Sequence, residues 1–223
     1  MTDSKEFFDA VRKGDATKVD GMLAKDRNLL TAKTDRGFTA VTVAAYMGGP
    51  GVLKTILAHQ PAMTVHEAAL AGDLKRVKEL VEKDPKLAND ASSPDGFPPL
   101  GLAAFMGRAD VVAFLLANGA DLNFAAPGLG FTALTGAVNS SHPEVVKILV
   151  KAGADPNYLY EEGAASVMAT AAANGNVEIV RTLLDAGADP NVPTKDGKTP
   201  LAWAVEKGHH EVAEMLRRHG ARN

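Results

Sequence analysis

The chain has 223 residues, of which 46% are hydrophobic and 23% charged, a composition typical of a folded globular protein and not of a disordered one. Its 24 basic and 27 acidic residues are scattered and give a formal charge of −3, so no basic stripe is available to neutralise nucleic-acid phosphates. The absence of cysteine excludes disulfides, a thiolate nucleophile and cysteine zinc sites.

The chain also lacks the usual membrane and export signals. Its N-terminal segment is charged without the apolar core of a signal peptide, and no apolar run approaches the roughly 20 residues that cross a bilayer. We therefore expect a cytoplasmic protein without a membrane partner. Aromatic residues make up only 5% of the chain, whereas alanine and glycine are abundant. This bias favours a solenoid, in which helices stack closely around a thin core.

The first part of the chain contains two helix pairs whose sequence is repeated further on. FFDAVRKGDATKVDGMLAKDRNLL, from residue 7, aligns with VHEAALAGDLKRVKELVEKDPKLA at an offset of 58. GFTAVTVAAYMGGPGVLKTIL then aligns with GFPPLGLAAFMGRADVVAFLL at an offset of 59. The first pair of units therefore looks like a duplication of the next pair, which predicts units at 4–35, 36–63, 64–94 and 95–128.

The junction near residue 60 has no room for a long turn. Thr64 followed by Glu67 forms a capping-box pattern that begins a helix. The preceding helix ends at His59, Gln60 and Pro61, almost directly before it. We therefore expect a shortened turn between the second and third units, with a local change in curvature.

Further along the chain the repetition is explicit. GADLN at Gly119 recurs as GADPN from Gly153 and from Gly187, about 34 residues apart each time. An apolar stripe with helical spacing precedes each of these glycines, which suit the left-handed backbone that ends a helix. An alanine-rich helix follows each turn, as in LGLAAFMG and MATAAANG. Each unit is thus a turn and two antiparallel helices, which predicts further units at 129–162, 163–195 and 196–223.

These units resemble the ankyrin repeat, whose pattern is approximately DxxGxTPLxxAAxxGxxExVxxLLxxGADxN. The stretch from Asp196 to Leu201 reads DGKTPL and contains TPL outright, and Thr132 to Leu134 match TPL with one change. Four consecutive units, from about Pro94 onward, carry most of the pattern, and the first three units are degenerate. The resemblance implies an all-α ankyrin-repeat solenoid: one domain over residues 1–223, built of stacked helix-turn-helix units with short β-hairpin-like turns.

Catalytic patterns are missing from the sequence. His66 and Glu67 begin a HEAAL string without the second histidine of a HExxH zinc helix. Ser140, Ser141 and His142 are neighbours in sequence, which is not the geometry of a catalytic triad. The glycine clusters lack the lysine of a phosphate loop. We therefore expect no enzyme activity, no catalytic residues, no cofactor and no metal.

The resemblance implies a groove, lined by turn tips and inner helices, that binds a partner protein. Clusters of exposed aromatic and methionine side chains are typical of such interfaces. An alternative stays open, in which these rings pack on one another or on the neighbouring turn. The predicted partner-binding residues lie after the turn glycines, near the ends of inner helices and in one extended loop: Phe38, Tyr46, Met47, Phe97, Phe105, Met106, Phe131, Tyr158 and Tyr160.

The predicted function is an adaptor, scaffold or inhibitor that binds an unidentified protein as a monomer, without nucleic acid. One alternative is a homo-oligomer closed by the groove or by an end face of the stack. A less favoured alternative is a hidden enzyme, which would need a pocket with convergent titratable groups. Trp203 takes the leucine position of its inner helix, so we expect it in the core.

Overall fold

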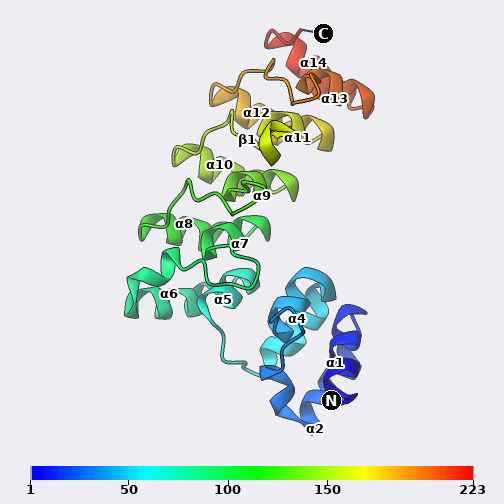
Figure 1. The fold of residues 1–223 in the computed structure, drawn as a ribbon, viewed down its shortest axis with the longest axis vertical. Helices are drawn as coiled ribbons and strands as arrows, with labels where there is room; N and C mark the ends of the chain where they lie inside the picture. Colours follow the sequence, from blue (N-terminus) through cyan, green and yellow to red (C-terminus); the bar gives the residue numbers. More distant parts are fainter. Residues whose placement is uncertain (1, 223) are drawn as a thin grey trace.

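The computed structural model describes residues 2–222 as an elongated stack of helix pairs (Figure 1). The inner helices are α1 (Thr2–Arg12), α3 (Ala40–Val43) continued by η2 (Ala44–Gly48), α5 (Val65–Ala71), α7 (Pro99–Phe105), α9 (Ala133–Asn139), α11 (Val167–Asn174) and α13 (Pro200–Glu206). The outer helices are α2 (Ala16–Lys25), α4 (Gly49–Ala58), α6 (Leu74–Lys83), α8 (Ala109–Ala117), α10 (Pro143–Lys151), α12 (Val177–Asp185) and α14 (His210–Arg218). The short elements are η1 (Arg27–Thr31), η3 (Pro85–Asn89), β1 (Leu159–Tyr160), η4 (Glu161–Gly163) and β2 (Ala165–Ser166).

A serine or threonine side chain caps the N-terminus of most of the inner helices. Each such side chain accepts a hydrogen bond from the backbone N–H three residues later, which would otherwise have no partner inside the helix. The local sequence therefore decides where each turn ends and the next helix starts. The capping residues are Thr39, Thr64, Thr132, Ser166 and Thr199.

The core is a continuous apolar seam between the layer of inner helices and the layer of outer helices. From α5 onward, each inner helix contacts the next inner helix and each outer helix contacts the next outer helix. Close approach is possible because the inner helices present alanine where they meet, as the sequence predicted. The alanines without any exposed surface include Ala103, Ala104, Ala137, Ala171, Ala172 and Ala204.

The turns between pairs project from the stack, and we call them fingers: residues 32–39, 90–98, 123–132, 157–166 and 191–199. In the finger at 157–166 two antiparallel strands pair Leu159 with Ser166 and Tyr160 with Ala165. Neighbouring fingers are joined through the backbone, since Glu161 N–H donates to the carbonyl oxygen of Leu129 at 2.8 Å. Lys195 N–H likewise donates to the carbonyl oxygen of Gly163 at 2.8 Å, so backbone bonds connect the last three fingers.

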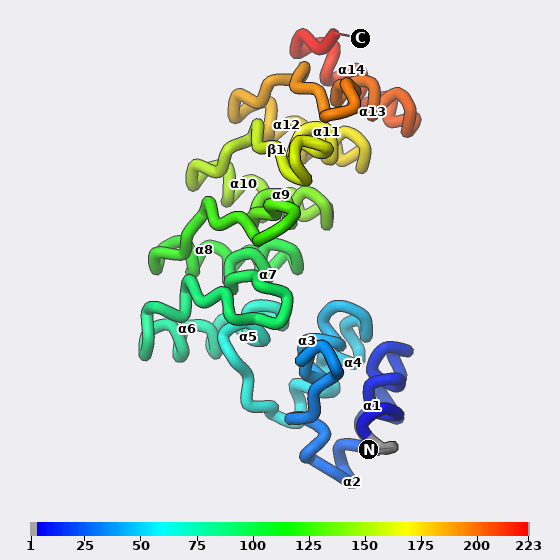
Figure 2. The backbone as a smooth tube through the Cα atoms, viewed as in Figure 1, coloured from blue at the N-terminus to red at the C-terminus, as the bar shows by residue number. Residues whose placement is uncertain are grey.

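The stack is interrupted between α4 and α5. Residues 60–64 contain neither helix nor strand, and no finger is formed there, which confirms the predicted shortened turn. Figure 2 shows the first four helices set apart from the regular column that begins with α5. We call residues 2–58 the N-terminal block and residues 65–222 the C-terminal block.

The segment Ala40–Ala58 corrects the expectation that no apolar run approaches the length of a membrane span. Over 19 residues it has a mean hydropathy of 1.3, so by length and composition it could cross a membrane. In the structure it is two helices of one repeat, because Gly49 has a φ of 72° and α4 packs back against η2. Half of its most apolar stretch is buried inside the fold. Core helices pass the same test of length and composition, so the segment alone does not indicate a membrane protein.

Trp203 corrects a second expectation, because its side chain is partly exposed and lies outside the core. It belongs to α13, which packs against the inner helix α11 on one side. The Lys198 ammonium lies 4.2 Å from the centre of the Trp203 ring. The equivalent Leu102 of α7 is buried because α5 and α9 flank that helix.

Candidate functional site

An apolar hollow of about 440 Å³ opens between α7, α9 and the fingers above them. Its walls are mainly aromatic rings, and its floor includes two glycines of the inner helices. No charged side chain lines it, so the hollow suits an uncharged group. We call this the apolar hollow; it is lined by Tyr46, Phe97, Gly101, Leu102, Phe105, Phe131, Thr132, Gly136 and Asn139.

The predicted aromatic ladder is partly packed on itself. Phe38 meets Tyr46 edge to face at 6.2 Å between ring centres, and Tyr46 meets Phe105 in the same way at 6.1 Å. Phe131 packs against Tyr160 at 5.3 Å. The rings therefore support one another, as the alternative interpretation of the sequence held, and they form a preordered wall.

Apolar side chains remain exposed beside this wall. Met47 is 64% exposed and Phe105 is 43% exposed, both near the C-terminal end of an inner helix. Two finger residues outside the predicted set of partner-binding residues, Leu129 and Leu159, are 54% and 44% exposed. An apolar residue among the glycines of the APGLG turn was the signal available for Leu129. Exposed apolar surface of this kind is typical of interaction surfaces.

Three of the predicted contact residues are placed differently from the rest. Tyr160 is only 4% exposed, so its ring is not available to a partner, which corrects its assignment to the contact surface. Tyr158 donates its hydroxyl to the carbonyl oxygen of Gly130 at 3.0 Å and so ties two fingers together. Met106 lines a separate hollow of about 360 Å³ beside α4. Phe97 and Phe131 do line the apolar hollow.

Tyr46 connects the two blocks. It belongs to η2 of the N-terminal block, yet its hydroxyl donates to Asp95 Oδ2 in the C-terminal block at 2.6 Å. Asp95 Oδ1 accepts a second hydrogen bond from the Ser93 hydroxyl at 2.7 Å. Burial of the ring, with a smaller contribution from Asp95, raises the pKa of Tyr46 far above its ordinary value. The phenol therefore stays protonated and keeps donating.

A second hollow of about 340 Å³ lies at the junction of the blocks, and Leu102 lines both hollows. We call it the junction hollow. Its lining includes Asp95 and Glu67, and Glu67 is only 7% exposed. Glu67 Oε2 accepts hydrogen bonds from the Thr64 backbone at 2.7 Å and hydroxyl at 2.9 Å, and Oε1 accepts one from the Thr39 hydroxyl. Among the described residues neither carboxylate forms an ion pair, although Lys33 lies exposed at the edge of the hollow.

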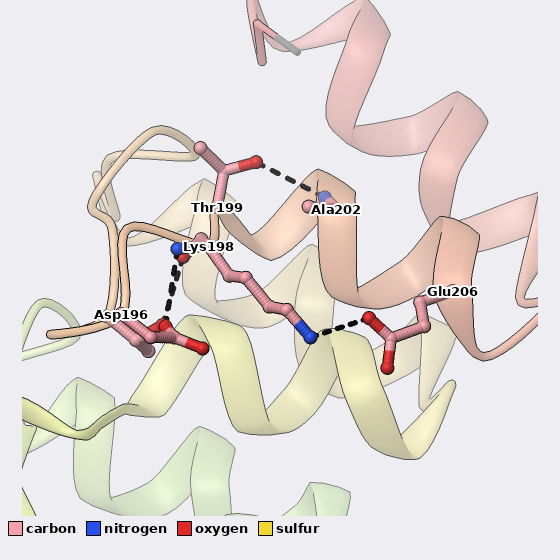
Figure 3. Close-up of polar contacts among 6 residues, drawn as sticks. Asp196, Lys198, Thr199, Ala202 and Glu206 are labelled. Atoms are coloured by element: carbon pink, nitrogen blue, oxygen red, sulfur yellow. Dashed lines mark hydrogen bonds and ion pairs between the residues drawn. The ribbon is translucent and has the colours of Figure 1, made fainter.

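The C-terminal end of the same face is polar. Lys198 takes the place that Phe97 and Phe131 have in earlier fingers, and its ammonium donates to Glu206 Oε2 at 2.7 Å (Figure 3). That contact lowers the pKa of Glu206. Figure 3 also shows Asp196 holding the finger by accepting a hydrogen bond from the Lys198 backbone at 3.3 Å. The character of the face thus changes from apolar to charged along the stack.

Two histidines, His142 and His209, form equivalent contacts between neighbouring repeats. His142 Nε2 lies 3.0 Å from the carbonyl oxygen of Phe105, and His209 Nε2 lies 3.0 Å from that of Ala173. Both rings therefore join the start of an outer helix to the end of the inner helix in the preceding repeat. Within residues 2–222, no group of three or more histidine, aspartate or glutamate side chains has the arrangement of a metal site.

Fold and surface together define a solenoid of helix pairs with projecting fingers. The family model described as Ankyrin repeats (3 copies) matches residues 65–160 and 159–223, which is most of the chain. The chain therefore belongs to the ankyrin-repeat family. A search of the curated proteins finds no match. Ankyrin repeats are generally protein–protein interaction modules and are typically not enzymes.

Proposed function

We propose that the chain is a non-enzymatic adaptor, scaffold or inhibitor that binds a partner protein on its finger-side face, around the apolar hollow. The observation that carries the proposal is the exposure of Met47 and Phe105 next to a preformed aromatic wall. Apolar side chains exposed together lose contact with water when a partner covers them, which contributes about 25 cal/mol per Å².

Rigidity of the surface supports the same function. The rings of Phe38, Tyr46 and Phe105 are already held by edge-to-face contacts, so little side-chain entropy is lost on association. Backbone hydrogen bonds join the finger at 157–166 to the fingers on either side of it, through Glu161 to Leu129 and Lys195 to Gly163. A partner spanning several fingers could bury about 800 Å² on each side, the size of a standard interface.

A second candidate function is self-association through the C-terminal end of the stack. Val205 on α13 is 53% exposed, and Trp203 beside it is only partly covered. The mass of the protein in solution, measured by light scattering across a concentration series, separates the two functions. A monomer at all concentrations supports the adaptor, whereas a dimer that Val205→Ser dissociates supports self-association.

The test of the proposed function is a quantitative capture of proteins from native lysate. We expect the double variant Met47→Ser, Phe105→Ser to lose the proteins that the wild-type chain retains. The matched control is Ala113→Ser, Ala117→Ser on the exposed side of α8, which should capture as the wild type does. Equal capture by all three folded proteins would refute the finger-side face as the binding surface.

A further inference from the structure

We propose that the two hollows recognise one segment of the partner: a large hydrophobic side chain enters the apolar hollow while an adjacent lysine or arginine enters the junction hollow. This inference rests on the proposed function and specifies the chemistry of its partner.

The size and neutrality of the apolar hollow define the first part of the ligand. About 440 Å³ exceeds the volume of a small side chain, and the walls are Tyr46, Phe97, Phe105 and Phe131. Aromatic rings favour other apolar groups in edge-to-face or offset contact. A charged group placed there would lose its water without finding a partner. The anchor is therefore a neutral residue such as tryptophan, phenylalanine or leucine.

Gly136 keeps the hollow open. It stands four residues after the capping Thr132, the position that Leu102 occupies after Pro98 in α7. A Cβ at Gly136 would lie 3.6 Å from Cβ of Phe105, which is ordinary van der Waals contact, so packing against Phe105 does not require glycine. Glycine inside a helix lowers stability relative to alanine. The open floor is therefore a feature that stability does not explain.

The junction hollow supplies charge complementarity. Its carboxylates, Asp95 and Glu67, receive hydrogen bonds from hydroxyl and backbone donors in the described structure. Lys33 and the buried His66 also line the hollow, and His66 Nε2 lies 2.7 Å from the carbonyl oxygen of Asp90. Asp95 holds the hydroxyl of Tyr46, whose ring forms a wall of the apolar hollow. A basic residue next to the hydrophobic anchor would therefore reach a carboxylate one ring length away. Ion pairs in such partly buried positions contribute to partner selection.

A polypeptide fits this surface better than a free small molecule. Exposed Met47 and Leu129 lie outside the apolar hollow, so a ligand that fills only the hollow leaves them in water. A chain continuing past the anchor covers them. Comparing a peptide with its isolated side chain shows whether a polypeptide or a free small molecule is the ligand.

The experiment is a titration of the folded chain with short blocked peptides, followed by the amide NMR signals of Gly101 and Gly136. The probes are Ac-Gly-Lys-Trp-Lys-Gly-NH2, Ac-Gly-Glu-Trp-Glu-Gly-NH2, Ac-Gly-Lys-Gly-Lys-Gly-NH2 and N-acetyltryptophanamide. We expect the first to bind at least about tenfold more tightly than each of the others, and to shift both glycine signals. No binding of the first peptide, or equal binding of N-acetyltryptophanamide, overturns the proposal.

Variants identify the two hollows separately. Gly136→Leu fills the apolar hollow and should weaken the lysine–tryptophan peptide by about tenfold or more. Gly136→Ala is the second variant: it should melt at a higher temperature than the wild type and still bind the peptide less tightly. Gly21→Ala in α2 is the control, since a Cβ there meets nothing within 4 Å, and it should bind as the wild type does. Unchanged binding by Gly136→Leu overturns the proposal.

The charge of the junction hollow is tested by Asp95→Asn, which should reduce the preference for the lysine-flanked over the glutamate-flanked peptide, with Glu67 retaining part of it. An undiminished preference for lysine would contradict the inference. Lysate capture distinguishes a failure of the two-hollow inference from a failure of the proposed function. If Gly136→Leu captures partners normally but Met47→Ser, Phe105→Ser does not, the function stands and the two-hollow inference falls. If both variants capture normally, the proposed surface itself is wrong.

Discussion

The N-terminal and C-terminal blocks are built from the same helix pair but are held together by different side chains. In the C-terminal block, Asn89 donates to the carbonyl oxygen of Gly119 at 2.8 Å and accepts from the Asp121 backbone at 2.6 Å. Thr31 is the counterpart of Asn89 in the duplicated segment, and its hydroxyl bonds instead to Asn28 within its own turn. The apolar pattern therefore specifies the helix pair, whereas single side chains in the turns couple one pair to the next.

This difference between the two blocks agrees with the range of the family match, which begins at residue 65, directly after the interruption of the stack. The N-terminal block still docks, but through a few contacts such as those of Tyr46 and Thr39. In repeat proteins stability is the sum of each unit and its neighbouring interfaces. We therefore expect the two blocks to open independently.

The largest expected effect on stability comes from truncating one side chain in the core of one block. Phe7 has no exposed surface, so Phe7→Ala should destabilise the N-terminal block by about 3–5 kcal/mol. Hydrogen exchange followed by mass spectrometry should then show lost protection in residues 2–58 and retained protection in residues 65–222. Leu149→Ala is the reciprocal control in the C-terminal block. Equal loss along the whole chain after Phe7→Ala would show that the blocks are a single cooperative unit.

The second effect concerns the coupling between repeats. Asn89→Ala removes two hydrogen bonds between neighbouring units and should lower the free energy of unfolding by about 2 kcal/mol. Thr31→Ala removes one exposed bond within a turn and should change it by less than about 1 kcal/mol. Urea denaturation measures both. Similar losses for the two variants would remove the distinction drawn between the blocks.

The third effect concerns the contact between blocks. Tyr46→Phe removes the hydrogen bond to Asp95 and should reduce the free energy of opening α3 and α4 by about 1–2 kcal/mol, measured by hydrogen exchange. Tyr158→Phe removes a similar bond inside the C-terminal block and should leave α3 and α4 unaffected. Faster exchange of these helices in Tyr158→Phe as well would argue against a localised junction.

The same tyrosine predicts a pH dependence. The native state raises the pKa of Tyr46 above the ordinary 10.0, so the unfolded chain loses this proton first as the pH rises. The stabilising contribution is therefore complete below about pH 10 and declines above it. Tyr46→Phe should show a shallower loss of stability between about pH 9 and 11 than the wild type. Identical slopes would contradict the assignment.

The smallest expected effect is a stabilisation of the N-terminal block. Gly21 lies inside α2 with open space around its Cα, so Gly21→Ala should stabilise the N-terminal block by about 0.5–1 kcal/mol. Exchange should slow in residues 2–58 and stay unchanged in α9 to α14. Slower exchange throughout would indicate tighter coupling than the structure implies.

The sequence predicted the fold because the signals that make a helix pair are local. Thr64 and Glu67 predicted the start of a helix, and the structure has the full capping box there. The placement of aromatic side chains was harder to predict, because it depends on neighbouring repeats. Adjacent strand residues face opposite ways, so either Leu159 or Tyr160 had to point inward, and the sequence did not say which. Trp203 was misplaced because, within the described residues, α13 packs against one inner helix, α11, whereas α7 packs against two.

The hollow could not be predicted for the same reason. Gly136 is unremarkable in its own helix and matters only because Phe105 and Phe97 come from the repeat before it. Tyr46 reaches the hollow from the other block, across the interruption. Such a site exists only once the units are stacked, so a pattern within one repeat does not reveal it.

Joint construction of the apolar hollow by both blocks is the claim on which the account depends. The most direct test is a nuclear Overhauser spectrum of the free protein with assigned aromatic rings. Ring centres 6.1 Å apart predict clear cross-peaks between Tyr46 and Phe105. Their absence, with the contacts inside each block preserved, would mean that the blocks do not dock in this way and that the hollow lacks one wall.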